Sequence, residues 1–264
     1  MNIYTIPISV FFWATVCVVG IFMEIGYKLG RAVHKRSNVE KESSVSAVTG
    51  SILALVAFML AFTFSIVASR YDARKELVRN EANAIGTAYL RSDFISEPDR
   101  SEAVKLFREY VDLRLAAVQP GNGNKVRDAL AGSNRIQRQL WHMAVVNARK
   151  DMNSDVAALY IESLNSVIDI HALRVSIALQ ARIPPGIWLV LFMLVFLGVI
   201  GVGYQAAIAE SGRSLVTVLL TVAFAMVVTL ILALDRPQCG YVPVSQQPLI
   251  DLQSSMAVDT ERFK

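Results

Sequence analysis

Four apolar residues recur at every fourth position in an uncharged stretch of the chain: Ala54, Phe58, Phe62 and Ile66. On a helix this spacing places them in one nearly straight row. If several copies of the helix surrounded an axis, the row would form rings of apolar side chains, which can close a pore by excluding water. The row also has an ordinary explanation, because such phenylalanines usually pack against neighbouring helices or lipid. The spacing alone leaves both interpretations open.

Polar side chains flank this row at both ends. Thr49 and Ser51 precede it and would present hydroxyl groups. Beyond the phenylalanines come two serines and two arginines: Ser65, Ser69, Arg70 and Arg74. In the pore interpretation Phe58, Phe62 and Ile66 form the constriction, the six polar residues line the approaches, and the arginines attract anions.

The residue patterns of known enzymes are absent from the sequence. The histidines His34, His142 and His171 are isolated, and a lone helical histidine is more often a surface or packing residue. The chain contains no P-loop, GxGxxG or GxSxG motif. Its acids alternate with lysine and arginine, as around Glu76, Glu81, Asp93 and Asp99, which favours ion pairs along a helix face. We expect no enzyme, no metal and no cofactor.

The composition indicates an integral membrane protein. Hydrophobic residues make up 54% of the chain and charged residues only 18%, well below the quarter typical of soluble domains. The mean hydropathy is +0.44. The net charge of +4 is spread with acids interleaved, which is unlike a nucleic-acid-binding surface. Apolar spans are predicted at about 4–26, 46–68, 185–207 and 214–234.

These spans define the expected organisation of an all-α membrane protein. Two spans in residues 1–68 precede a soluble insert, residues 69–183, and two spans follow in residues 184–235. No proline interrupts the second span, and apolar residues continue at helical spacing as far as Tyr89, which predicts one helix of about 48 residues. The insert has the pattern of four amphipathic helices, a bundle. Residues 236–264 form a polar tail with little helical pattern.

The charge distribution does not decide the membrane orientation. Basic residues in the loop 28–45 favour that loop inside. A second basic cluster, between Arg70 and Arg79 at the other end of the second span, favours the opposite orientation.

Two segments resemble a bacterial membrane family described as bestrophin-like. They are AFTFSIVASRYDARKELVRNEANAIGTAYLRSDF, which begins in the second span, and LALDRPQCGYVPVSQQPL, which follows the fourth. The wider resemblance is to bestrophins, which are pentameric anion channels. It implies a homo-oligomer, with a pentamer favoured, that lies in the bacterial inner membrane and passes small anions such as chloride. It also implies that the insert and both termini are cytoplasmic.

The resemblance assigns roles to particular positions. Phe58, Phe62 and Ile66 match the apolar neck of bestrophins, and Tyr71, Asp72 and Arg74 match the segment after it. Lys75-Glu76-Leu77 stands where bestrophins have a tryptophan-rich stretch, and the acidic calcium-binding clasp of the animal members is missing.

The motif Asp235-Arg236-Pro237 closes the fourth span and has two interpretations. The charged pair and proline can simply end the helix at the headgroup level. Alternatively, Arg236 pairs with an acid of the insert and couples the tail to the bundle. We favour helix termination.

Two functions of different classes fit these patterns. The first is a ring-shaped ion channel in a lipid bilayer, with Phe58 and Phe62 facing the axis. The second is a non-conducting scaffold or sensor whose spans anchor a helical bundle that binds a protein partner. In that case Phe58 and Phe62 would face lipid or a neighbouring helix.

Overall fold

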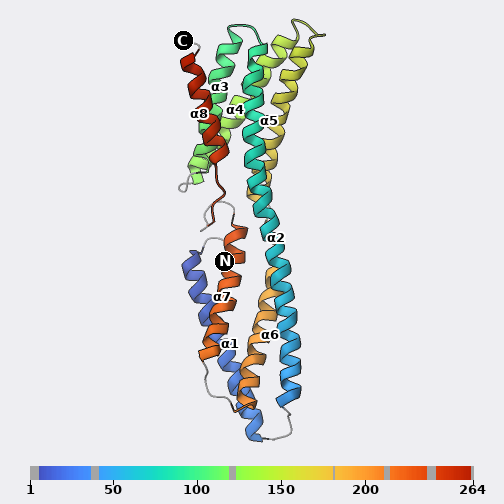
Figure 1. Ribbon diagram of the computed structural model, residues 1–264, viewed down its shortest axis with the longest axis vertical. Helices are drawn as coiled ribbons and strands as arrows, with labels where there is room; N and C mark the ends of the chain where they lie inside the picture. Colours follow the sequence, from blue (N-terminus) through green and yellow to red (C-terminus); the bar gives the residue numbers. More distant parts are fainter. Residues whose placement is uncertain are drawn as a thin grey trace. The chain divides into compact units, whose positions relative to one another are not determined.

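The structure, a computed structural model, describes residues 6–36, 42–118, 123–180, 182–210, 215–236 and 242–262. Throughout these ranges the regular elements are helices (Figure 1). They are α1 (Ile8–Arg36), α2 (Glu42–Arg91), the short 3₁₀ helix η2 (Ser92–Phe94), α3 (Asp99–Ala116), α4 (Gly123–Ala148), α5 (Asp155–Gln180), α6 (Pro185–Ile208), α7 (Leu215–Asp235) and α8 (Gln247–Arg262). The prediction of one long helix through the second span is confirmed by α2, which has 50 residues.

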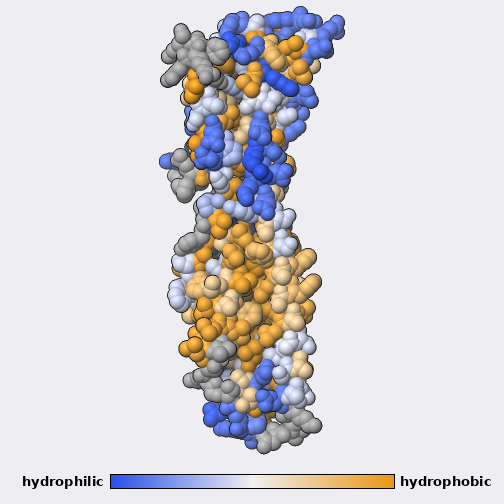
Figure 2. Space-filling view, in the orientation of Figure 1, coloured by the Kyte–Doolittle hydropathy of each residue, from blue (hydrophilic) through white to orange (hydrophobic). Residues whose placement is uncertain are grey.

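The chain forms two compact units. Unit 1 consists of Met1–Tyr71 and Arg182–Val242, and unit 2 of Asp72–Ala181 and Pro243–Lys264. Side chains over α1, α6 and α7 of unit 1 are predominantly apolar at the surface, whereas those of unit 2 are mixed (Figure 2). This contrast is the one expected between a part solvated by lipid and a part solvated by water.

Close contact between α1 and α6 organises unit 1. A Cβ atom on Gly26 would clash with the backbone of Ile200, and one on Gly203 would clash with the backbone of Met23. Glycine at both positions lets the two helix backbones approach, as in many membrane helix pairs. Phe22 of α1 also stacks on Phe196 of α6, with ring centroids 4.3 Å apart. Glycines of both helices therefore lie where α1 and α6 come closest.

Among the described residues, five helical segments are long and apolar enough to cross a membrane. Four of them correspond to the predicted spans. The fifth, Asp155–Ile177 in α5, has the lowest mean hydropathy, 1.2 against 2.1–2.7 for the others. Tyr160, Leu164 and Val167 of α5 are buried in the core of unit 2. We keep the prediction of four spans, with α5 in the insert.

The core of unit 2 contains a helix that the sequence analysis missed. Residues 247–262 were expected to be part of a polar tail with little helical pattern, but they form α8. Leu249 and Met256 of α8 are buried in the same cluster as Ile85, Phe107 and Ile136. The tail prediction is wrong because three apolar residues at positions 249, 252 and 256 suffice for a helix that packs against an existing core.

Candidate functional site

One face of α2 is packed within unit 1. Its buried side chains recur at intervals of three, four and seven residues: Thr49, Val56, Leu60, Thr63 and Val67. Gly198 and Gly201 of α6 lie against this face, and Cβ atoms there would contact Val56 and Thr49. The Thr49 hydroxyl donates to the Gly201 carbonyl over 3.4 Å. The glycines of α6 therefore determine which side of α2 is covered.

The opposite face of α2 is exposed in the protomer. Phe58 and Phe62 lie on it with 65% and 52% of their surface accessible. Their rings are nearly parallel, with centroids 6.5 Å apart. Ser51, Ser65 and Ser69 are exposed as well. Hydroxyl groups thus lie on both sides of an aromatic pair along one face of the helix.

Two predicted lining or constriction residues lie off this face. Thr49 is 3% exposed and packs on α6, so in the protomer its hydroxyl does not lie on the exposed face of α2. Ile66 is half-buried, between the packed and exposed faces. A regular helix turns 100° per residue, so positions four apart drift by 40° per step, and the row from Ala54 to Ile66 curves around the helix.

The two arginines expected to attract anions differ in burial. Arg70 lies 3.5 Å from the carboxylate of Asp235, whose side chain is fully buried. Arg74 is 7% exposed. In the protomer, Arg74 is covered and Arg70 lies at the border between the packed and exposed faces of α2, so their role in lining a pore stays a prediction.

Asp235 connects three segments of unit 1. One carboxylate oxygen faces Arg70 of α2, and the other accepts a hydrogen bond of 3.2 Å from the backbone N–H of Ile183. Arg236 donates to the carbonyl of Ile6 over 2.5 Å. Asp235 and Arg236 therefore do more than end α7, because each makes a specific contact with another segment. Pro237, the third residue of the motif, lies outside the described residues.

The two remaining motif positions differ in exposure. Tyr71 is half-buried, whereas Asp72 is exposed and lies 3.7 Å from Lys75, one turn further along α2.

Unit 2 contains a buried ionic cluster that the sequence analysis did not identify. Glu81 of α2 is fully buried and accepts a hydrogen bond of 2.7 Å from Arg114 of α3. It also pairs with Arg174 of α5, which donates to Gln246 over 2.5 Å. Glu81 was expected to form ion pairs along one helix face, but its partners lie on two other helices. The signal available was its position three residues after Val78 and four residues before Ile85, on the apolar side of α2.

Tyr110 of α3 lies beside this cluster. Its hydroxyl is 3.1 Å from Nδ1 of His171 and accepts a hydrogen bond from Gln137 over 3.0 Å. Burial raises the pKa of Tyr110, so its hydroxyl stays protonated.

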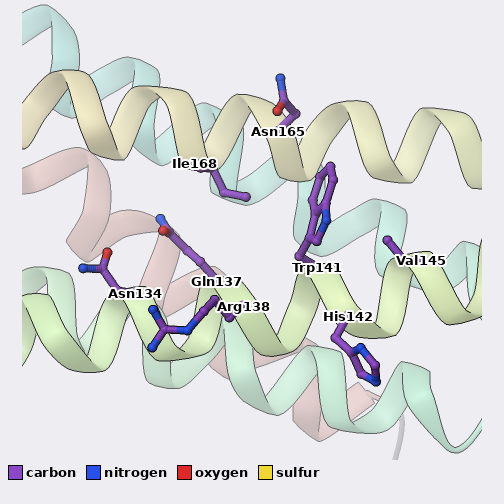
Figure 3. A pocket seen from close by; sticks show the side chains of 8 residues that line it. All are labelled: Asn134, Gln137, Arg138, Trp141, His142, Val145, Asn165 and Ile168. Atoms are coloured by element: carbon purple, nitrogen blue, oxygen red, sulfur yellow. The ribbon is translucent and has the colours of Figure 1, made fainter.

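A groove of about 560 Å³ runs between α4 and α5 of unit 2. Its lining combines amides with Arg138, Trp141 and Ile168. In Figure 3 the Trp141 and Gln137 side chains extend toward α5, and His142 points away from it. His142 is exposed, as expected for a lone surface histidine. Among the described residues, no three histidine, cysteine or acidic side chains are grouped closely enough to hold a metal ion.

The apolar spans and the helical fold define an integral membrane protein. Residues 16–249 match the Bestrophin-like domain family, and the chain belongs to this family. No curated protein matches the chain in sequence.

Solved structures show the same fold. A variant of a bacterial bestrophin homologue from Klebsiella pneumoniae aligns with a TM-score of 0.69 and 16% identity, over 96% of this chain and 98% of that chain. A second variant of that homologue aligns with a TM-score of 0.66 and 15% identity, over 94% and 99%. A variant of a protein described only as a membrane protein gives a TM-score of 0.66 and 15% identity, over 95% and 97%.

Proposed function

We propose that this protein is an oligomeric ion channel whose pore is lined by the exposed face of α2. The observation that carries the proposal is the exposure of Phe58 and Phe62 on a helix whose opposite face is packed on α6. Two parallel aromatic rings on such a face would form an apolar constriction if copies of α2 surrounded an axis. Membership of the Bestrophin-like family supports this function.

The polar residues on the same face favour a pore over a purely lipid-facing surface. Lipid contact requires only apolar side chains, yet Ser51 precedes the aromatic pair and Ser65 and Ser69 follow it. Hydroxyl groups on both sides of a short apolar stretch are the arrangement expected where ions must be partly hydrated before and after a constriction.

The proposed assembly is a closed ring of identical subunits, with five favoured by the resemblance to bestrophins. Rings form when one surface of a protomer contacts a different surface of the next and the rotation closes. The ring would lie in the bacterial inner membrane with the insert and both termini cytoplasmic.

Two arginines of α2 bear on whether the proposed channel passes anions or cations. The expectation of anions such as chloride rested on the resemblance to bestrophins and on the positive charges of Arg70 and Arg74. Arg74 is buried, and Arg70 keeps 29% of its side chain exposed beside the carboxylate of Asp235. The exposed face of α2 therefore gains little positive charge from these two residues, and the proposed preference for anions rests on the resemblance to bestrophins.

Ion flux from liposomes tests this proposal. The purified full-length protein is compared with Phe58→Ala, Phe62→Ala and the control Phe64→Ala, with potassium and chloride both followed. Phe64 is 40% exposed on the same helix but lies on a different face. We expect flux to rise severalfold in the first two variants only.

The other outcomes are equally informative. An equal rise in Phe64→Ala would indicate general loosening of the protein and contradict a constriction at Phe58 and Phe62. No flux in any variant, in protein shown to be folded and inserted, would favour the non-conducting scaffold that binds a protein partner.

A further inference from the structure

The groove between α4 and α5 lies within unit 2 and has the size of a small-molecule site. Its volume is about 560 Å³, and sites for small ligands span about 300–1,000 Å³. On α4 the lining residues recur at intervals of three and four, so they share one side of the helix: Asn134, Arg138, Trp141 and Val145. Ile168 of α5 adds an apolar side chain. The groove therefore combines apolar surface with a few polar groups, as ligand sites do.

Gln137 lines this groove although it is only 8% exposed. Its side chain extends from α4 toward α5 (Figure 3). The amide nitrogen, Nε2, donates to the Tyr110 hydroxyl over 3.0 Å, which fixes the orientation of the amide. The amide oxygen, Oε1, is hydrogen-bonded to no residue in the described part of the chain. It is thus available to accept a hydrogen bond from a molecule in the groove.

Arg138 supplies positive charge to the groove. It is exposed and forms no ion pair with another described residue. Arg135, one turn earlier on α4, differs in this respect, because its guanidinium lies 3.0 Å from the carboxylate of Glu109 on α3. His142 also borders the groove, but its ring points away from α5 (Figure 3).

The charge of Arg138 is not offset within the groove, since no acid among the described residues lines it. Asp169 of α5 follows Ile168 in the chain, but its carboxylate accepts a hydrogen bond of 3.0 Å from Asn165 and does not pair with Arg138. The groove therefore favours an anionic ligand. A guanidinium recognises a carboxylate especially well, because the two groups can form a pair of parallel hydrogen bonds.

Trp141, one turn from Arg138, supplies a flat aromatic surface. The residue is 37% exposed, and its side chain extends toward α5 (Figure 3). Aromatic rings pack on one another in stacked or edge-to-face arrangements that an aliphatic chain cannot reproduce. The half-buried Val145 and Ile168 offer further apolar contact. This part of the groove favours a ligand with a flat ring.

We propose that the groove is a binding site for a small aromatic carboxylate that carries a hydroxyl group on its ring. The carboxylate would bind the guanidinium of Arg138, the ring would pack on Trp141, and the hydroxyl would donate to Oε1 of Gln137. The inference goes beyond the proposed channel function and does not depend on ion conduction, because the residues that carry it all belong to unit 2.

Isothermal titration calorimetry on the purified full-length protein tests this site, with 4-hydroxybenzoate as the probe. Three analogues each lack one recognised feature. They are 4-hydroxybenzyl alcohol, which has no charge, 4-hydroxycyclohexanecarboxylate, which has no flat ring, and benzoate, which has no hydroxyl donor. We expect saturable binding of 4-hydroxybenzoate and weaker binding of each analogue.

Substitutions locate the binding in the groove. Arg138→Gln should raise the dissociation constant of 4-hydroxybenzoate about tenfold, because a charge-assisted hydrogen bond is lost. Arg138→Lys should restore part of the affinity, and Trp141→Leu should weaken binding severalfold. Arg135→Gln is the matched control, since Arg135 is an exposed arginine of the same helix that does not line the groove. It should leave the dissociation constant unchanged. Circular dichroism would verify that each variant is folded.

Several results would overturn the inference. They are the absence of saturable binding to the unmodified protein, equal binding of the uncharged or non-planar analogue, and affinity that survives both Arg138→Gln and Trp141→Leu. An equal loss of affinity in Arg135→Gln would show a response to overall charge and would overturn it as well. A protein that binds the probe as expected but passes no ions would contradict the channel function alone.

Discussion

The buried carboxylate of Asp235, at the last residue of α7, lies 3.5 Å from the guanidinium of Arg70 on α2. This pair turns a basic residue inward at the point where α2 approaches the end of the apolar span. The same carboxylate accepts the backbone N–H of Ile183, just before α6 begins. Asp235 thus holds three segments of unit 1 together, α2 through the ion pair and the start of α6 through the hydrogen bond from Ile183.

Asp235→Asn should destabilise the protein by about 2–3 kcal/mol, because removing one partner of a largely buried pair leaves the other charge uncompensated. The partial exposure of Arg70 keeps the loss at the low end. The measurement is the free energy of unfolding in mixed micelles. The double variant Asp235→Asn with Arg70→Gln should lose less than the sum of the single variants, and strict additivity would contradict a direct interaction.

Gly26→Ala and Gly203→Ala should each lower stability and the yield of folded protein, at a cost of about 1–3 kcal/mol or more, because the added methyl group meets the backbone of the facing helix. Gly20→Ala, also in α1, is the control, since a Cβ there meets nothing within 4 Å. Thermal unfolding in detergent compares the three. A Gly20→Ala variant as unstable as the others would show that glycine content, not helix contact, is responsible.

Glu81→Gln should destabilise the protein by about 3 kcal/mol, because Arg114 and Arg174 would keep their charges inside the core without the carboxylate that now pairs with both. Unfolding of purified protein, followed by circular dichroism, measures the effect. Glu102→Gln, an exposed acid on α3, should change the free energy of unfolding by less than about 0.5 kcal/mol. Equal effects of the two substitutions would argue against a buried cluster.

Leu249→Ala should lower the free energy of unfolding by about 2–4 kcal/mol, because this side chain of α8 is fully buried in the core of unit 2. Ile250→Ala provides a matched control one residue away, since Ile250 is 41% exposed. Limited proteolysis gives a second readout, with faster cleavage of the C-terminal segment expected in Leu249→Ala. Identical stability of the two variants would mean that α8 is not docked in this core.

Local patterns determined the features that depend on a single helix. The absence of charge from Ser46 to Ala68 and the apolar spacing as far as Tyr89 predict α2, which the structure confirms. Helical spacing also places Phe58 and Phe62 on one side, whatever that side contacts. The length of α2 and the shared side of Phe58 and Phe62 do not depend on other segments of the chain, so they can be predicted from the local sequence.

Which face of α2 is buried and which is exposed depends on the tertiary structure. Gly198 and Gly201 of α6 cover the side that bears Thr49, and Asp235 draws Arg70 to the same side, although these partners are more than 130 residues away in the chain. Likewise, α8 has too few apolar residues to be predicted alone and becomes a core helix through Leu249 and Met256. Periodicity specifies which residues share a face, but only long-range packing decides which face is buried and which side chains of α2 stay exposed.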